Sequence, residues 1–320
     1  MMIDGNWSNE NFETQPTDGK GAFRRQESKF RNWIVDNESR SEPADGDFIA
    51  EVGRYHLFVS LSCPWASRSL LTRKLKRLEE VITVSVVEPE LSQEGWKFGP
   101  QSYREEIGLA AYDYLHQVYA LADSSFTGRV TVPVLWDKQR RTIVNNESAD
   151  IIRILDTGFS EWANNDLSLC PDDLSAQIDV LNGQLYKALN NGVYRAGFAQ
   201  TQSAYDEAVH DVFEMLDTLD TRIGDAGPFI FGERFTEADI RLFVTLVRFD
   251  AVYYGLFKCN FRRLTEYINL TTYLTRILSI PGVRDTVDMS HIKRGYYSIR
   301  SVNPSGIVPI GPYDLSLTQG

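Results

Sequence analysis

The sequence predicts an α/β domain followed by an all-α domain, and three observations support this fold class. Residues 55–87 contain a β-rich run, a helical run and a second β-rich run. A β-α-β order implies parallel strands packed under helices. After about residue 172, apolar residues instead recur every three or four positions, as one face of a helix requires. A chain of 320 residues has room for two such domains.

Changes in composition along the chain predict where the domains begin and end. Residues 1–50 are polar and rich in Asn, Asp, Gly and Ser, so we expect an irregular N-terminal arm. The α/β domain is expected over 51–160, with a long insert at 90–128. Loops of that length in a compact domain are usually functional. We expect the all-α domain over 172–290 and a C-terminal tail over 291–320.

Local patterns predict the individual elements. In the first domain they predict strands at 55–59, 81–87, 130–136 and 142–144, with helices at 65–78 and 149–155. In the second domain they predict helices at 174–189, 205–223, 240–249 and 270–278. Thr236 and Asp239 form a capping-box variant ahead of the third of these helices.

Charge and hydropathy exclude several classes of function. With 33 basic and 44 acidic side chains the formal charge is −11, which disfavours binding to nucleic acid or to anionic lipid. The apolar run at 242–247 lies between Arg241 and Arg248. This run is far shorter than the roughly 20 residues that cross a bilayer. The N-terminal residues contain no apolar block, so no secretory signal is expected.

The cysteines and histidines predict free thiols and no metal. Cys63, Cys170 and Cys259 are too few for a disulfide framework, and an odd count favours free thiols in the reducing cytoplasm. The four histidines share no ligand spacing with any cysteine, so we predict no metal site. No Gly-rich phosphate loop is present in the sequence.

Cys63 is the strongest candidate for chemistry. It follows a predicted strand and directly precedes a predicted helix. The N–H groups and the positive dipole end at a helix start lower the pKa of a thiol and favour the thiolate. The alternative is a buried core cysteine. Ala66 stands where a dithiol motif would have its second cysteine, so the resolving thiol has to come from outside the chain.

Other segments leave two interpretations open. Pro133 lies near the start of the predicted strand at 130–136, where a trans or a cis bond fits. Glu147 and Ser148 either cap a helix or offer an anion site, in which a ligand carboxylate meets the helix N-terminus and Glu147 meets an ammonium group. Tyrosines of the helical half either pack in the core or stabilise a thiolate by donating a hydrogen bond.

Together these residues resemble a known family. The strand followed by Cys63-Pro64-Trp65-Ala66, then Val132-Pro133, Glu147-Ser148 and an all-α half with Thr236 and Asp239, resembles a glutathione transferase. Longer stretches are similar to the glutathionyl-hydroquinone reductases, the cysteine-type Xi class, and these stretches are 129–137, 143–148, 190–198, 237–242, 248–250 and 303–309.

The resemblance implies a fold and a reaction. The implied fold is a thioredoxin-like, glutathione-binding domain followed by a helical glutathione-transferase domain, in a homodimer. In the implied reaction, Cys63 attacks the sulfur of a glutathionyl-hydroquinone, the hydroquinone leaves, and Cys63 forms a mixed disulfide with glutathione. A second glutathione then releases oxidised glutathione and the free thiol.

The resemblance also implies roles for individual residues. Cys63 is the nucleophile, and Tyr194 exchanges a proton with the hydroquinone. Tyr253 and Tyr296 lower the pKa of the thiol, and Tyr297 lines the substrate pocket. The residues implied to hold glutathione are Trp96, Arg129, Val130, Thr131, Val132, Pro133 (as a cis-proline facing the thiol), Glu147 and Ser148.

The sequence departs from the family pattern at a few positions, and two other functions are alternatives. Family members often have histidine where this chain has Ser67 and Gly295, and a later histidine near Arg300. These departures would change the substrate preference or the thiol donor. One alternative is an omega-like thioltransferase or dehydroascorbate reductase, which would not need the tyrosines. The other is a non-catalytic ligand-binding protein of the same fold, which would not need Cys63.

Overall fold

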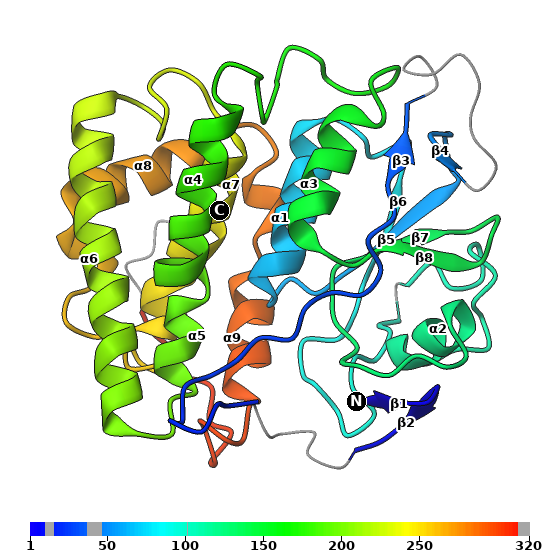
Figure 1. The fold of residues 1–320 in the computed structure, drawn as a ribbon, viewed down its shortest axis with the longest axis horizontal. Helices are drawn as coiled ribbons and strands as arrows, with labels where there is room; N and C mark the ends of the chain where they lie inside the picture. Colours follow the sequence, from blue (N-terminus) through cyan, green and yellow to red (C-terminus); the bar gives the residue numbers. More distant parts are fainter. Residues whose placement is uncertain (10–15, 37–46, 101, 313–320) are drawn as a thin grey trace. The chain divides into compact units, whose positions relative to one another are not determined.

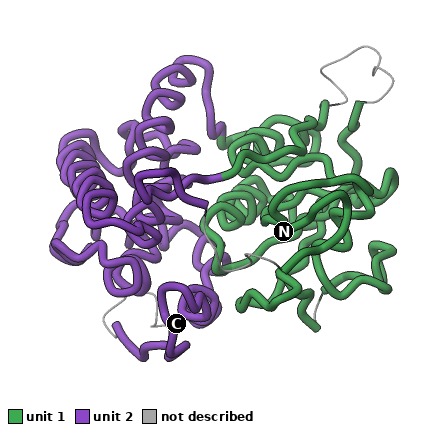
Figure 2. Tube along the Cα trace, turned by 60° about the horizontal axis from the view of Figure 1, so that its bottom comes forward, with its two compact units in different colours: residues 1–12, 26–167 green, residues 13–25, 168–320 purple. Residues whose placement is uncertain are grey.

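The structure is a computed structural model that describes residues 1–9, 16–36, 47–100 and 102–312. Parts of the predicted arm, at 10–15 and 37–46, and the end of the predicted tail, at 313–320, lie outside the described residues. The chain divides into two compact units, which Figure 2 colours separately. Unit 1 contains residues 1–12 and 26–167, and unit 2 contains residues 13–25 and 168–320. The N-terminal arm therefore contributes to both units.

Unit 1 is built on a mixed sheet with the strand order β6-β5-β7-β8 (Figure 1). Its strands are β5 (Tyr55–Val59), β6 (Thr83–Val86), β7 (Val134–Asp137) and β8 (Thr142–Asn145). Strand β5 pairs in parallel with β6, which confirms the predicted β-α-β unit. Strand β7 runs antiparallel to both β5 and β8, which confirms the predicted hairpin. Strand β7 begins later than predicted, because Pro133 has no N–H to donate to a ladder.

Three helices accompany this sheet. They are α1 (Pro64–Leu75), α2 (Leu115–Ala122) and α3 (Ser148–Thr157), and α1 packs against α3. Helices α1 and α3 were predicted, whereas α2 lies within the predicted insert at 90–128 and was missed. Its buried residues Leu115, Val118 and Tyr119 lie on one helix face, a pattern that the many neighbouring aromatic residues obscured.

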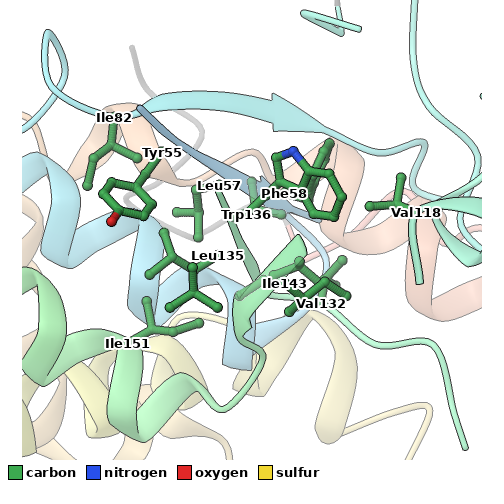
Figure 3. Close-up of a cluster of buried hydrophobic side chains, with 14 of the residues drawn as sticks. Tyr55, Leu57, Phe58, Ile82, Val118, Val132, Leu135, Trp136, Ile143 and Ile151 are labelled. Atoms are coloured by element: carbon green, nitrogen blue, oxygen red, sulfur yellow. The ribbon is translucent and has the colours of Figure 1, made fainter. Parts of the chain in front are cut away.

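The core of unit 1 surrounds the central strands (Figure 3). Every residue of β5 is buried, as expected for a strand covered on both faces. Leu135 and Trp136 of β7 are fully buried in the same cluster. Val132, just before β7, belongs to this cluster as well, and Cys63 packs against it. The core therefore includes Val132 of the segment that precedes β7 and supports the partly buried Cys63.

The N-terminal arm is more regular than predicted. It contains four short strands: β1 (Met2–Ile3), β2 (Asn6–Trp7), β3 (Ile34–Val35) and β4 (Phe48–Ile49). Strands β1 and β2 pair antiparallel, and β3 and β4 pair in parallel. Met2 and Ile34 are buried in the core cluster of unit 1. These side chains carry apolar surface into the core, which corrects the expectation of an irregular arm over 1–50.

The regular elements in the described part of unit 2 are helical. The α-helices are α4 (Ser175–Leu185), α5 (Gly192–Gly197), α6 (Gln202–Ala226), α7 (Glu237–Leu246), α8 (Ile268–Leu278) and α9 (Met289–Tyr297). The π-helical turns are η1 (Tyr186–Asn190) and η2 (Phe249–Tyr253), and the 3-10 turns are η3 (Leu264–Glu266) and η4 (Arg284–Thr286). Helix α6 packs against α5 and α8. No helix in the described residues is long and apolar enough to cross a membrane.

Helices α4, α6, α7 and α8 were predicted, and the start of α7 confirms the predicted capping box. The Asp239 carboxylate accepts the backbone N–H and the hydroxyl of Thr236 at 2.7 and 3.1 Å. Helices α5 and α9 were missed. Helix α9 corrects the predicted tail at 291–320, since the Asp288 carboxylate caps its first turn and Ile292 and Tyr296 are buried.

Candidate functional site

Cys63 lies between β5 and α1 and is the N-cap residue of α1. Its carbonyl accepts the N–H of Ser67 at 2.9 Å, so the helix starts beside the thiol. Pro64 is the first helical residue, where a missing N–H costs no intrahelical hydrogen bond. The half-buried thiol donates to the carbonyl oxygen of Val132 at 3.6 Å. The predicted strand–Cys–Pro–helix arrangement is present.

The other two cysteines differ from Cys63 in their surroundings. Cys259 is buried, and burial raises the pKa of its thiol well above the ordinary value. Its thiol therefore stays protonated at neutral pH. Cys170 is half-buried, and it precedes Pro171 in a segment with no strand-to-helix transition. Of the three cysteines, only Cys63 occupies a helix N-cap position within the described residues.

The segment 130–133 lies next to the thiol in unit 1. The Val132–Pro133 bond is cis, so the structure selects the cis alternative. Val132 is buried, while Val130 and Thr131 are half-buried. These three residues precede β7 and take no part in its strand pairing. Their backbone groups are thus not used in the sheet.

The start of α3 carries Glu147 and Ser148. Glu147 is the N-cap residue, and its carboxylate accepts the N–H of Ala149 at 3.1 Å and the hydroxyl of Ser28 at 3.0 Å. The capping interpretation is thus confirmed, and the anion site stays a prediction. Ser148 is buried, and its hydroxyl accepts a hydrogen bond from Arg68 of α1 at 3.4 Å. Arg68 places a buried positive charge beside this helix start, which the sequence pattern did not reveal.

Tyr119 of α2 joins the two segments just described. Its hydroxyl donates to the Thr131 carbonyl at 2.9 Å and accepts from the Asn146 amide at 3.1 Å. Burial raises the pKa of Tyr119, so the phenol remains a donor at neutral pH. Thr131 precedes Val132, and Asn146 precedes Glu147. Tyr119 therefore connects the thiol-proximal segment to the start of α3, a role that sequence reasoning missed because it treated 90–128 as an insert.

Trp96 and Arg129 are the two remaining residues of unit 1 that were predicted to hold glutathione. Trp96 is half-buried against the core, and its carbonyl accepts the N–H of Leu115 at 2.9 Å. Helix α2 thus contacts Trp96 at its first residue and Thr131 through Tyr119. Arg129 is half-buried, and its charge adds to burial in lowering the pKa of the Met1 amino group. The binding of glutathione by Trp96 and Arg129 stays a prediction.

Unit 2 gathers three tyrosine hydroxyls, which we call the phenol cluster: Tyr194 of α5, Tyr253 of η2 and Tyr296 of α9. The Tyr296 hydroxyl lies 2.5 Å from that of Tyr194 and 2.9 Å from that of Tyr253. Burial, with the neighbouring Tyr194 and Tyr253, raises the pKa of Tyr296 well above its ordinary value. Tyr296 has one proton and two hydroxyl neighbours, so at least one neighbour donates to it. The half-buried Tyr194 is the most exposed of the three.

Phe257 supports the phenol cluster from one side. Its ring centroid lies 5.4 Å from Tyr194, 5.6 Å from Tyr253 and 5.7 Å from Tyr296. A β-carbon at Gly197 would meet the Phe257 ring at 2.3 Å, so the glycine allows α5 to approach this ring. The three tyrosines therefore form an aromatic cluster with joined hydroxyls, and the separate roles expected of Tyr194 and of Tyr253 and Tyr296 stay predictions.

Tyr297 is placed differently from the phenol cluster. It is half-buried, and its hydroxyl donates to the carbonyl of Ala251 in η2 at 3.2 Å. This contact braces the turn that carries Tyr253. A role for Tyr297 in a substrate pocket stays a prediction. Among the described residues, no group of three or more His, Cys, Asp or Glu side chains is arranged to hold a metal ion.

Two protein domain families match parts of the chain. Residues 62–157 match the glutathione S-transferase N-terminal domain, and residues 202–276 match the glutathione S-transferase C-terminal domain. The chain is also 47% identical to Glutathionyl-hydroquinone reductase YqjG of Escherichia coli (strain K12), over 100% of this chain and 98% of that protein. The chain belongs to the glutathionyl-hydroquinone reductases of the glutathione transferase family. It is 44% identical to Glutathionyl-hydroquinone reductase PcpF of Sphingobium chlorophenolicum, over 98% of this chain and 96% of that protein.

Solved structures agree with this family assignment. The glutathione-bound structure of YqjG matches with a TM-score of 0.85 and 44% identity, over 98% of this chain and 95% of that chain. The Xi-class glutathione transferase of Natrialba magadii matches with a TM-score of 0.89 and 43% identity, over 100% of this chain and 95% of that chain. The predicted fold class, a thioredoxin-like domain followed by a helical domain, is confirmed.

Proposed function

We propose that this protein reduces glutathionyl-hydroquinones to hydroquinones with glutathione as co-substrate. One observation carries the proposal: the Cys63 thiol lies at the start of α1, 3.6 Å from the Val132 carbonyl and next to the cis Val132–Pro133 bond. A thiol at a helix N-terminus is favoured as thiolate, which is the nucleophilic form. The close similarity to YqjG and PcpF supports this choice of substrate.

In the first half-reaction, the Cys63 thiolate attacks the sulfur of the glutathionyl group. A sulfur–sulfur bond forms while the carbon–sulfur bond breaks, and the electron pair of the broken bond goes to the hydroquinone carbon. That carbon takes up a proton, for which Tyr194 is the proposed donor. Tyr296, whose hydroxyl lies 2.5 Å from that of Tyr194, then supplies a proton to Tyr194.

In the second half-reaction, another glutathione loses its thiol proton, which restores the phenol cluster, and its thiolate attacks the glutathione sulfur of the mixed disulfide. Oxidised glutathione leaves, and Cys63 returns to the thiolate, which the start of α1 stabilises as a leaving group. Ala66 lies where a resolving cysteine would lie in a dithiol motif, so the second thiol comes from solution. The net reaction consumes one glutathionyl-hydroquinone and one glutathione, and it yields one hydroquinone and one oxidised glutathione.

We propose that glutathione binds along the residues that surround the thiol in unit 1. The start of α3 would receive a carboxylate of glutathione, since its N–H groups and dipole favour an anion, and Glu147 would meet the amino group. The backbone of 130–132 is not used in strand pairing and would meet the peptide of glutathione. The full proposed set is Trp96, Arg129, Val130, Thr131, Val132, Pro133, Glu147 and Ser148.

The remaining parts of the proposal concern the tyrosines and the assembly. Tyr253 and Tyr296 would donate hydrogen bonds that favour the thiolate form of Cys63. Tyr297 would line the pocket for the hydroquinone ring. We also propose a homodimer located in the cytoplasm, from the family resemblance and from the odd number of cysteines.

One assay tests the reaction and the nucleophile together. The protein is incubated with a glutathionyl-hydroquinone and excess glutathione, and hydroquinone release is followed by chromatography. We expect rapid release by the wild type and by Cys170→Ser, and a loss of about a thousandfold or more in Cys63→Ser. Intact-mass measurement without free glutathione should show one bound glutathione on the wild type and none on Cys63→Ser.

The same assay separates the alternatives. If the wild type releases no hydroquinone but reduces a mixed disulfide or dehydroascorbate, the omega-like thioltransferase replaces the present proposal. If the wild type reduces none of these substrates yet binds glutathione, the non-catalytic alternative replaces it.

A further inference from the structure

Arg25 of the N-terminal arm contacts the phenol-bearing helix α5 at two points. Its Nε–H donates to the Asn191 side-chain oxygen at 3.0 Å. Its guanidinium carbon lies 4.9 Å from the centroid of the Tyr194 ring, a cation–π distance. Asn191 is the N-cap residue of α5, and Tyr194 is on that helix. One side chain thus holds both the start of the helix and the ring that it carries.

The arm around Arg25 is itself held to unit 2. Phe23 is buried, and its ring lies 5.6 Å from Phe198 at the end of α5. The Gln200 N–H donates to the Gly21 carbonyl at 3.1 Å. Gly21 has φ +81° and lies so close to Thr201 that a β-carbon would meet its methyl group at 2.9 Å. Arg25 therefore extends from an anchored segment.

A positive charge over a phenol ring has a defined electrostatic effect. The ring becomes more negative when the phenol loses its proton, so the attraction of a guanidinium is stronger for the phenolate. The side chains that face Tyr194 in unit 2 include the neutral groups of Phe198, Tyr253, Phe257 and Tyr296. Arg25 adds a positive charge at the Tyr194 ring, and the buried Arg248 is a second cation that acts on Tyr296.

We propose that Arg25 is a positioning residue for Tyr194: it holds the phenol ring in place and favours negative charge on its oxygen once the proton has moved to the hydroquinone. This inference rests on the proposed function, because it assigns Arg25 to the proton-transfer step. The Tyr194 O–H bond breaks as the hydroquinone carbon–hydrogen bond forms. The phenolate then regains a proton through Tyr296.

The first test compares substitutions at Arg25 in the hydroquinone-release assay. Arg25→Met keeps an unbranched but shorter side chain and removes both the charge and the bond to Asn191, and we expect kcat to fall about tenfold with the KM for glutathione unchanged. Arg25→Lys keeps a charge but loses the planar group and the bond to Asn191, so we expect an intermediate loss. The matched control is Arg24→Met, since Arg24 is an exposed neighbour paired with Asp18, and its kcat should stay at the wild-type value.

A double substitution shows whether Arg25 acts through the Tyr194 hydroxyl. In a Tyr194→Phe background the ring stays and the proton donor is gone, so Arg25→Met should then reduce kcat less than about twofold. If it still reduces kcat about tenfold, Arg25 acts elsewhere and the inference is wrong. If Arg25→Met has wild-type kcat in the otherwise unchanged protein, the inference is wrong while the proposed function stands.

A titration that needs no turnover separates this inference from the proposed function. The protein is labelled with 3-fluorotyrosine, and the fluorine NMR signal of Tyr194 is assigned by its absence in Tyr194→Phe. We expect the pKa of Tyr194 to be higher in Arg25→Met than in the wild type and unchanged in Arg24→Met. An unchanged or lower pKa in Arg25→Met overturns the inference, whatever the substrate of the enzyme is.

Discussion

Tyr119 of unit 1 and Tyr296 of unit 2 are buried phenols with different kinds of hydrogen-bond partner. Unit 1 also buries the His56 ring, which lies 2.7 Å from the Thr83 hydroxyl and 2.9 Å from the Ser85 hydroxyl. Tyr119 of the same unit donates to a backbone carbonyl and accepts from an amide. In unit 2 the Tyr296 hydroxyl is bonded only to hydroxyls in its described hydrogen bonds, those of Tyr194 and Tyr253.

This difference fits the proposal that Tyr119 holds geometry and that the phenol cluster moves protons. A carbonyl can only accept and an amide N–H can only donate, so the two shorter hydrogen bonds of Tyr119, to Thr131 and Asn146, have fixed directions. A hydroxyl can do either, so the bonds among three phenols can reverse direction as a proton passes along them. We infer that unit 1 supplies a rigid surface for glutathione and that unit 2 supplies the exchangeable proton.

The largest expected effect is a loss of stability in acid that originates in unit 1. Burial lowers the pKa of His56 from 6.5 to about 3, so the folded state favours the neutral ring. The stabilisation is present above pH 6.5 and is lost as the pH falls to about 3. It amounts to about 5 kcal/mol over that range. Urea unfolding at several pH values should show this dependence in the wild type and lose it in His56→Gln.

The control for this prediction is His210→Gln, since His210 is exposed on α6. It should leave the dependence of the unfolding free energy on pH unchanged. An equal acid sensitivity in wild type and His56→Gln would show that His56 does not set the difference between the units.

Unit 2 should contribute a smaller pH dependence of opposite sign, in which the unfolding free energy falls as the pH rises. Burial raises the pKa of the Asp239 carboxyl from 3.8 to about 6, although four hydrogen bonds oppose this shift. The contribution is present in full below pH 3.8 and is lost as the pH rises through about 6. It amounts to about 3 kcal/mol. Asp239→Asn should abolish this part of the pH dependence of urea unfolding, and the exposed Asp206→Asn should preserve it.

The proton-moving role of the phenol cluster predicts a loss of rate. Tyr296→Phe removes the hydroxyl that both other phenols contact, and we expect kcat to fall about a hundredfold, equal to about 2.7 kcal/mol. The KM for glutathione should stay the same, because the residues proposed to bind it are in unit 1. Tyr205→Phe, whose hydroxyl bonds to the Lys258 carbonyl, is the matched control. A change in kcat of less than about threefold in Tyr296→Phe would contradict the role.

The smallest effect is expected at Tyr119. Tyr119→Phe leaves the Asn146 amide and the Thr131 carbonyl without this partner, which should lower the unfolding free energy by about 1 to 2 kcal/mol. We expect the KM for glutathione to rise about fivefold with little change in kcat, since the hydroxyl orients binding groups. Tyr112→Phe, in the same predicted insert, should leave the unfolding free energy and the KM for glutathione unchanged. If Tyr119→Phe instead lowers kcat with an unchanged KM, the proposed division between the units is wrong.

Local patterns were enough to predict most of the fold and the nucleophile. The strand–Cys63–Pro64–helix order and the Thr236–Asp239 capping box involve residues close together in the chain. The forces that make them, helix geometry and backbone hydrogen bonding, act over a few residues. The same holds for the apolar periodicity that marks most helices of unit 2. A short helix such as α5 has too few turns for that periodicity to be recognised in the sequence.

Contacts between distant segments were decided only by the tertiary structure. Arg25 lies 166 positions from Asn191, and Tyr194 lies 102 positions from Tyr296. No local pattern specifies such pairs, because they form when separate elements pack around a shared core. Tyr119 was hidden for a related reason, since its burial depends on where α2 docks. The sequence determined which chemical groups are present and where helices begin, whereas packing decided which of these groups meet.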